Sequence, residues 1–288
     1  MAARAIVVGA GPGGCSAAIV LARAGFRVQL VEKGRRGRDK VCGDALIPDS
    51  LAALEALGCL APVLAQARSV DCVRLAVSGH APVDLRGRLA CFPRSEFDAL
   101  LLAEAEAAGA EFLPGLEFTG VREHAGRVAG VRLRGANGHP LELAADYVVL
   151  ATGAGAAALE AAGMCLRRAP SGIGLRAYFE VPPGMAEDED AFTLSYDRST
   201  CPAFGYVFPG PGGIFNLGVG YFQDSLRRPR NTNLRDLWGA FLQGCPAAAR
   251  IRRYGRRRGS PGERPSRGHA GWCCAAGAGC PGSSRPRD

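Results

Sequence analysis

The sequence lacks any long apolar run. A helix that spans a membrane needs about 20 predominantly apolar residues in succession, and no such run occurs among the 288 residues. The chain begins with MAARAIVVGAG, which leads directly into a strand and a glycine turn, without the apolar region of a signal peptide. We therefore expect a cytoplasmic protein without a transmembrane helix, and we leave open a peripheral contact with a membrane.

Patterns typical of metal sites and disulfide scaffolds are also missing. The 11 cysteines are scattered without a C-x-x-C pair, and the four histidines show no metal-ligand spacing. Free thiols are the state expected in the cytoplasm. We therefore predict no metal site.

Excess charge of either sign is absent from the first 249 residues, which hold 25 basic and 25 acidic side chains. The formal charge of +8 arises entirely in residues 250–288, where 10 arginines stand against two acidic residues. A nucleic-acid-binding domain needs a basic face on its folded part. The charge distribution therefore argues against a nucleic-acid partner.

The start of the chain carries a dinucleotide motif. The stretch AIVVGAGPGGCSAAIVLARAGFRVQLVEK is predicted to form a strand, a glycine turn, a helix and a second strand that ends at Glu32. A carboxylate there can accept hydrogen bonds from ribose hydroxyls. The pattern alone does not distinguish FAD from NAD. The expected cofactor contacts in this stretch are Gly9, Gly11, Pro12, Gly13, Gly14, Glu32 and Lys33.

Further motifs follow in a characteristic order. They are CGDALIP at 42–48, PRSEFD at 93–98, VVLATGA at 148–154, IGLRAYFE at 173–180 and FGYVFPGPGGIFNLGVGYF at 204–222. With the glycine motif and Glu32, this succession resembles the geranylgeranyl reductase family, within the p-hydroxybenzoate-hydroxylase-like flavoproteins. The resemblance spans about residues 5–222.

This resemblance implies a non-covalently bound FAD. Glu32 would lie on the adenosine ribose, Arg94 near the phosphate and ribityl portion, and Val121 near the adenine. The further cofactor contacts would be Cys42, Gly43, Ala45, Ala151, Thr152 and Gly153. Cys42 is a catalytic candidate by position only, and a buried structural thiol is an equal alternative. Asp44 is as compatible with a turn as with a site.

The resemblance also implies an antiparallel sheet in the second half, which forms one wall of a long apolar cavity. Aromatic residues that would line it are Tyr178, Phe204, Tyr206, Phe208 and Phe215, although each also suits an ordinary sheet core. The implied reaction is transfer of hydride through the flavin to an isoprenoid double bond, with NAD(P)H or another reductant as electron donor. A small-molecule or lipid substrate is thus the expected partner. A flavin monooxygenase or halogenase on the same scaffold, or a catalytically impaired FAD-binding fragment, are the alternatives.

The expected architecture is α/β (α+β overall), with a Rossmann-like FAD-binding parallel sheet and an inserted antiparallel β substrate domain. Residues 1–170 would form the FAD-binding domain, with a small β meander at about 116–145, and residues 171–250 an incomplete substrate domain. Residues 251–288 would be a disordered tail rich in Arg, Gly and Pro, since 255–288 contain no Leu, Ile, Val or Phe.

The resembled family has a third flavin contact after its substrate sheet, and nothing in residues 223–288 has that pattern. A truncation or a reading-frame shift in a GC-rich gene would explain this. A genuine disordered tail, or a metal site from Cys273, Cys274 and Cys280, are the other interpretations.

Overall fold

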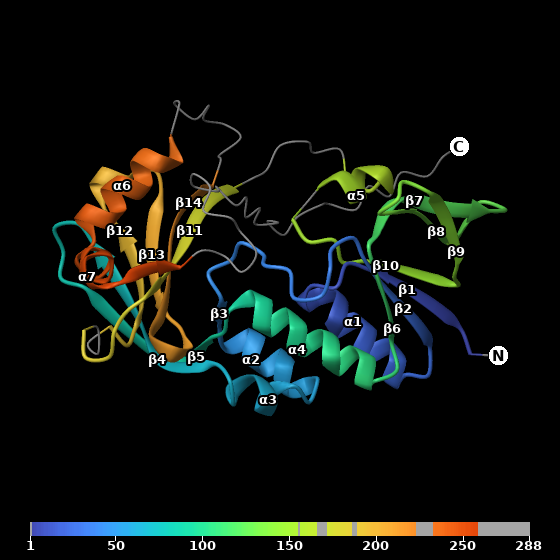
Figure 1. The fold of residues 1–288 in the computed structure, drawn as a ribbon, viewed down its shortest axis with the longest axis horizontal. Helices are drawn as coiled ribbons and strands as arrows, with labels where there is room; N and C mark the ends of the chain where they lie inside the picture. The colour runs from blue at the N-terminus through green and yellow to red at the C-terminus, as the bar shows by residue number, and fades with distance from the viewer. Residues whose placement is uncertain (1, 155, 166–171, 186–188, 223–232, 259–288) are drawn as a thin grey trace, which may run out of the picture.

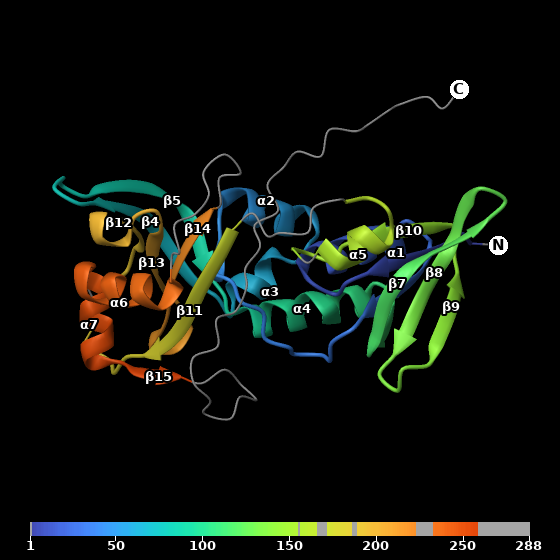
Figure 2. The same cartoon turned by 90° about the horizontal axis from the view of Figure 1, so that it is seen from above.

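The structure is a computed structural model that describes residues 2–154, 156–165, 172–185, 189–222 and 233–258. The molecule is elongated, with one sheet near each end and a group of helices between them (Figures 1 and 2). The expected contribution of Cys273, Cys274 and Cys280 lies outside the described residues. The same is true of the tail from residue 259 onward.

The first sheet has four parallel strands in the order β10-β1-β2-β6. Strand β1 is fully apolar after its first residue, as expected for a parallel strand covered on both faces. The predicted strand–turn–helix–strand unit and the parallel Rossmann-like sheet are therefore confirmed. The strands are β1 (Arg4–Val8), β2 (Arg27–Glu32), β6 (Glu111–Pro114) and β10 (Tyr147–Leu150).

Both faces of this sheet are covered. Alternate residues of β1, such as Ala5 and Val7, pack toward α1 and α4, whereas Ile6 and Val8 pack toward the small meander β7–β9. The meander lies where the sequence predicts a small β meander, at about residues 116–145. Its strands are β7 (Leu116–His124), β8 (Arg127–Gly135) and β9 (Pro140–Ala144), and the helices of this half are α1 (Pro12–Arg23), α2 (Pro48–Ala56), α3 (Leu60–Leu64), α4 (Arg94–Ala107) and α5 (Ala156–Ala161).

The second sheet is larger than expected from residues 171–250. Eight strands lie in the order β15-β11-β14-β13-β12-β4-β5-β3, and β4 pairs in parallel with β12. Three of its strands therefore come from residues 45–91, which the sequence assigned to the cofactor domain. The strands are β3 (Ala45–Leu46), β4 (Arg68–Val77), β5 (Val83–Cys91), β11 (Gly172–Glu180), β12 (Phe192–Tyr196), β13 (Phe204–Pro209), β14 (Ile214–Phe222) and β15 (Arg256–Arg258).

Helices α6 (Leu234–Gly244) and α7 (Pro246–Tyr254) cover one face of the second sheet (Figure 1). Ile251 of α7 is fully buried against this sheet, and β15 pairs with β11. The predicted beginning of the disordered tail at residue 251 is therefore wrong for residues 251–258. Among the residues that the structure describes, none of the helices combines the length and apolar character needed to cross a membrane.

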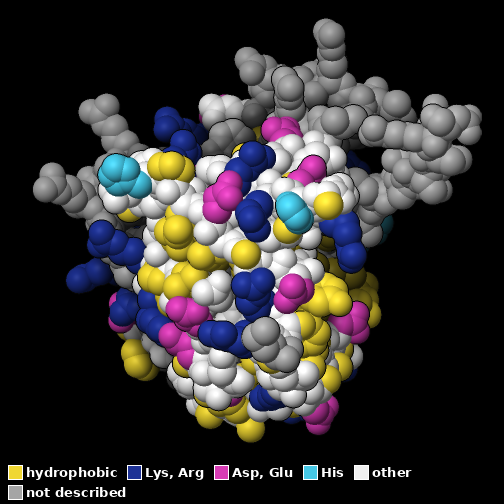
Figure 3. Space-filling model, turned by 90° about the vertical axis from the view of Figure 1, so that its right-hand side faces the viewer, with side chains coloured by type: hydrophobic (Ala, Val, Ile, Leu, Met, Phe, Trp, Pro, Cys, Tyr) yellow, Lys and Arg dark blue, Asp and Glu magenta, His cyan; other side chains and the backbone are white. Residues whose placement is uncertain are grey.

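Charged side chains of both signs alternate on the surface at the meander end of the molecule. Figure 3 shows Lys and Arg interspersed there with Asp and Glu. Several of them form ion pairs across the meander strands, including Arg134 with Glu117 and Arg122 with Glu142. This face therefore presents no field of a single sign.

The revised boundary gives a stability prediction. We expect Ile251→Ala to lower the free energy of unfolding by about 2–4 kcal/mol, because it leaves a cavity in the core between α7 and the sheet. Arg252→Ala, at the exposed neighbouring position, is the matched control and should cost less than about 0.5 kcal/mol. Urea unfolding followed by circular dichroism measures both. Equal, small effects would contradict the assignment of α7 to the folded core.

Candidate functional site

The glycine turn between β1 and α1 has two kinds of glycine. Gly9 has a φ of 104°, and a Cβ there would lie 2.4 Å from the carbonyl oxygen of Ala151. A Cβ on Gly14 would lie 1.7 Å from the carbonyl oxygen of Gly9. These two glycines are required by the fold itself, because strand, turn and helix contact one another at their backbones.

Gly11 and Gly13 have a different environment. A Cβ on Gly11 would meet only the Arg94 guanidinium, 3.9 Å away, and a Cβ on Gly13 would meet nothing within 4 Å. Helix α1 has no side-chain cap and no acidic residue in its first turn. No side chain therefore caps its first N–H groups, and the positive end of the helix dipole there suits an anionic pyrophosphate.

Glu32 lies beside this turn at the end of β2 and is buried. Its carboxylate accepts hydrogen bonds from the N–H groups of Ala10 and Gly34, and it pairs with Arg38 at 3.1 Å. Burial alone would raise the pKa of Glu32, but the two N–H groups and Arg38 hold it below its ordinary value. Glu32 therefore carries a negative charge at neutral pH, next to the N-terminus of α1. Lys33 follows it and is exposed.

The segment after β10 completes the cradle at the same edge of the sheet. The Ala151 N–H donates to the carbonyl of Val8, which places Ala151, Thr152 and Gly153 beside the glycine turn. The Thr152 hydroxyl is buried and has no hydrogen-bond partner within the described part of the chain. An unsatisfied buried hydroxyl at this position is consistent with a ligand that completes its hydrogen bonding. Together with the open space at Gly11 and Gly13, it fits a bound dinucleotide.

Arg94 is the first residue of α4, and its guanidinium lies next to Gly11 of the glycine turn. Its guanidinium pairs with Asp98 at 2.6 Å, and Cys42 lies near enough to influence its charge. Burial opposes its positive charge, but Asp98 and Cys42 more than offset this and raise the pKa of Arg94. The expected placement of Arg94 near the phosphate-binding turn is consistent with this geometry. Val121 lies in β7, half-buried on the meander side of the first sheet, and its contact with an adenine stays a prediction.

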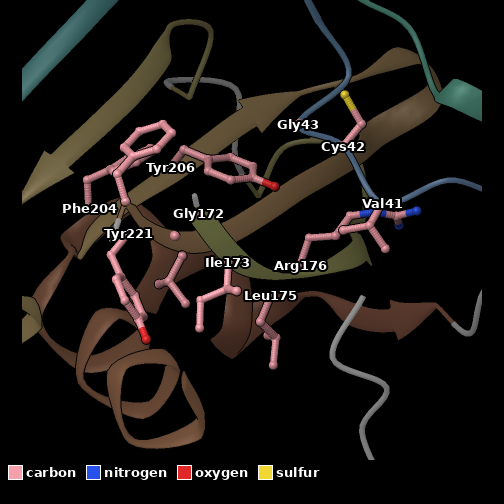
Figure 4. Close-up of a pocket in the computed structure, with 14 residues that line it drawn as sticks. Val41, Cys42, Gly43, Gly172, Ile173, Leu175, Arg176, Phe204, Tyr206 and Tyr221 are labelled. Carbon is pink, nitrogen blue, oxygen red and sulfur yellow. The ribbon is translucent and has the colours of Figure 1, made fainter. Parts of the chain in front are cut away.

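A mostly apolar pocket lies on the second sheet, and the loop of Val41, Cys42 and Gly43 forms one wall (Figure 4). The cavity has a volume of about 130 Å³ and reaches Phe204 and Tyr206 of β13. Tyr206 stacks on Phe208 with ring centroids 4.7 Å apart. The structure thus brings the predicted Cys42 and Gly43 together with the predicted Tyr206, although they are more than 160 residues apart.

Strand alternation separates the predicted aromatic residues into two groups. Tyr178 pairs with Asn216, and Phe208 pairs with the same residue from the other side, so these side chains share the face toward Cys42. Phe215 is the next residue along β14 and lies in the core under α6 and α7. The assignment of Phe215 to the cavity is therefore wrong, because its side chain points to the opposite face of the sheet.

Asp44 is a buried site residue that the sequence left undecided. Its φ is 66°, and its carboxylate accepts hydrogen bonds from the Tyr178 hydroxyl at 2.6 Å, the Asn216 amide at 2.7 Å and the Arg94 N–H at 3.2 Å. Burial raises the pKa of Asp44 to about 6, against the opposing effect of these hydrogen bonds and of Arg176. In the sequence, Asp44 was visible only as the acidic residue of the CGDALIP stretch. Its hydrogen-bond partners lie on α4, β11 and β14, far away along the chain.

Arg176 is a second residue that the sequence missed. It lies on β11, lines the pocket, and pairs with Asp39 at 2.6 Å. Its guanidinium carbon lies 4.2 Å from the ring centroid of Tyr178. The side chain is 4% exposed, and its Nε has no hydrogen-bond partner among the described residues. It therefore brings a buried positive charge to the boundary between the two halves.

The described residues contain no group of three or more His, Cys, Asp or Glu side chains that could hold a metal ion. Cys42 itself is half-buried and free. The arrangement can therefore bind an anionic dinucleotide on the first half and an apolar molecule on the second. The Cys42–Gly43 loop lies between the two.

Comparison with known proteins agrees with this arrangement. The family model described as "FAD binding domain" matches residues 2–203. The chain is 32% identical over 247 residues to the menaquinone reductase of Mycobacterium tuberculosis, an alignment that covers 81% of this chain and 58% of that protein. The chain therefore spans little more than half the length of this curated relative.

Solved structures share the fold. A geranylgeranyl bacteriochlorophyll reductase-like protein from Thermoplasma acidophilum matches with a TM-score of 0.74 and 23% identity, over 90% of this chain and 64% of that one. The myxobacterial chondrochloren halogenase matches with a TM-score of 0.75 and 21% identity, over 91% of this chain and 62% of that one. These matches establish the fold, which is shared by proteins named as reductases and as halogenases.

Asp44 provides a pH prediction. Its pKa is about 6 in the folded protein and 3.8 in an ordinary environment, so the native state binds this proton more tightly than the unfolded chain does. The contribution of Asp44 to stability is therefore most favourable below pH 3.8 and declines as the pH rises to about 6.

We expect the free energy of unfolding of the wild type, relative to Asp44→Asn, to decrease by up to about 3 kcal/mol across this range. Urea unfolding at half-unit pH steps measures the difference. Asp49→Asn, at an exposed position on α2, is the control for loss of a surface carboxylate. A pH-independent difference would show that Asp44 keeps an ordinary acidity.

Proposed function

Because the chain belongs to the FAD binding domain family, we propose that it is an FAD-dependent oxidoreductase that saturates a carbon–carbon double bond of an isoprenoid chain. The observation that carries the proposal is the apolar pocket on the second sheet, whose wall is the Cys42–Gly43 loop of the cofactor half. A dinucleotide site and an apolar pocket that share one loop suit a reaction between a bound cofactor and an apolar substrate.

The residues of the first half would hold the cofactor as follows. The N–H groups at Gly11 and Gly13 would receive the pyrophosphate, Glu32 the ribose hydroxyls, and Arg94 would add a positive charge beside the phosphates. Thr152 would complete its hydrogen bonding with the ligand. Bound FAD supplies transfer of a hydride equivalent, and the chain supplies binding, orientation and exclusion of water.

The second half would bind the substrate. Rings line up on the pocket face of the sheet: Tyr196 stacks on Phe204, and Phe204 stacks on Phe222. The exposed ends of this row are Tyr196 and Phe222. A continuous aromatic strip of this kind favours a long apolar chain over a compact polar molecule. The name of the menaquinone reductase supports the same substrate class, since menaquinone carries an isoprenoid side chain.

A flavin halogenase or monooxygenase is the second candidate, because the halogenase scaffold superimposes equally well. The FAD-loaded chain, reduced with dithionite without oxygen, should add two hydrogens to geranylgeraniol, detected by mass spectrometry. The same chain with oxygen, NAD(P)H, halide and an aromatic substrate should give no oxygenated or halogenated product. The reverse pattern would favour the second candidate.

The two kinds of glycine allow cofactor binding to be separated from folding. Gly11→Ala should leave stability unchanged, since its φ of −84° suits alanine and its Cβ has space. It should nevertheless lower the affinity for FAD at least about 10-fold, because the methyl group would occupy the place of the pyrophosphate.

Gly14→Ala is the matched control at the other end of the motif. It should destabilise the fold by about 2 kcal/mol or more, because its Cβ would overlap the Gly9 carbonyl. Flavin fluorescence titration and urea unfolding measure the two effects. Unchanged FAD affinity in Gly11→Ala would contradict the proposed position of the cofactor.

A further inference from the structure

A buried pair of polar side chains connects the cofactor half to the second sheet. Asp44 is 2% exposed and Asn216 is 1% exposed. Asp44 also has a left-handed backbone, which is unfavourable for a residue other than glycine and persists only where surrounding contacts determine it. Neither the cofactor cradle nor the aromatic strip accounts for this pair.

Asp44 is held from several directions. Its carboxylate binds the first N–H of α4, at Arg94, and the Tyr178 hydroxyl on β11. Its backbone carbonyl accepts the N–H of Phe92. Since Pro93 provides no side-chain cap for α4, Asp44 serves as a cap supplied by another segment. The position of Asp44 is therefore fixed relative to both halves.

Asn216 uses its whole amide group. One N–H of its Nδ2 donates to the Asp44 carboxylate at 2.7 Å, and Nδ2 also donates to the Cys42 carbonyl at 2.8 Å. Its Oδ1 accepts a hydrogen bond from the Tyr206 hydroxyl at 3.3 Å. Asn216 thus contacts both the loop that forms the pocket wall and a ring that lines the pocket.

The Cys42–Gly43 peptide has little freedom on its other sides. A Cβ on Gly43 would lie 3.0 Å from the Phe208 ring. Cys42 lies near enough to the Arg94 guanidinium to affect its pKa, and that guanidinium lies next to Gly11 in the cofactor turn. The peptide therefore stands between the pocket on one side and the phosphate-binding turn on the other.

We propose that Asn216, oriented by Asp44, is a positioning residue whose amide sets the place of the Cys42–Gly43 peptide between the cofactor turn and the pocket. The substrate sheet thereby contributes to cofactor affinity without touching the dinucleotide motif. The part of this inference that concerns cofactor affinity rests on the proposed function; the part that concerns the loop does not.

The test uses substitutions that change the donors of the pair without changing its shape. Asn216→Asp replaces both N–H donors by a carboxylate that faces Asp44 and the Cys42 carbonyl. The double variant Asp44→Asn/Asn216→Asp restores a donor between the two side chains, but still leaves the Cys42 carbonyl without one. Tyr206→Phe is the control, because it removes a hydrogen bond of Asn216 and keeps both Nδ2 bonds.

The loop is followed by the rate at which iodoacetamide labels Cys42, read by mass spectrometry relative to the exposed Cys201. At pH 7.5 we expect this ratio to rise about 10-fold in Asn216→Asp and in the double variant, as expected for loss of a buried hydrogen bond. It should stay within about twofold of wild type in Tyr206→Phe. The double variant should recover most, but not all, of the stability that Asn216→Asp loses, because the Cys42 carbonyl remains without a donor.

Acid should rescue the stability of Asn216→Asp alone. Two adjacent carboxylates can share one proton, so stability should return toward wild type at pH 5.5, whereas the labelling ratio should stay raised as in the double variant, because the Cys42 carbonyl still lacks a donor. The other groups that act on Asp44 are Tyr178 and Arg176 from β11, the Arg94 N–H from α4 and Cys91 from β5. They are identical in all variants, so the difference between variants isolates the pair.

Cofactor affinity is the second measurement. The dissociation constant for FAD, from flavin fluorescence, should rise about 10-fold in the double variant and stay unchanged in Tyr206→Phe. Wild-type labelling together with wild-type FAD affinity in the double variant would overturn the inference. Absence of FAD binding by the wild type would overturn the proposed function instead, and the labelling ratios would then decide the role of Asn216 by themselves.

Discussion

The structure depends on one buried carboxylate that joins its two halves. Asp44 accepts hydrogen bonds from the start of α4, from β11 and from β14, and so connects the helices of the first sheet to the second sheet. A buried carboxylate is costly unless it is fully hydrogen-bonded. These hydrogen bonds hold Tyr178 and Asn216 toward the Cys42–Gly43 loop, which forms one wall of the pocket.

The cofactor turn depends on a second constraint, the close approach of backbones at Gly9, Gly14 and Ala151. This contact brings the ends of β1 and β10 against the start of α1, so that unpaired N–H groups, Glu32 and Thr152 meet at one edge of the sheet. Arg94 reaches the same edge from α4, and Cys42 of the pocket wall lies near enough to affect its pKa. Arg94 therefore stands between the cofactor turn and the pocket wall.

The features that differ from the sequence-based predictions all depend on contacts between residues far apart in the chain. The strands β4 and β12 pair although they are more than 100 residues apart, and no local pattern signals such a pairing. Phe215 looked suitable for a cavity, but only the register with Phe179 of β11 shows that it faces the helices. Residues 251–258, at the start of the predicted disordered tail, are instead held in place by the buried Ile251 and by the pairing of β15 with β11.

The sequence by itself determined the unit of β1, glycine turn, α1 and β2, with Glu32 at the end of β2, and the helix beginning at Arg94, because each depends on residues close together in the chain. Only the tertiary structure decided which aromatic residues face the pocket and that Asp44 and Asn216 form a pair. Strand register and burial set those features, since a shift of one residue along β14 would exchange Asn216 for Phe215.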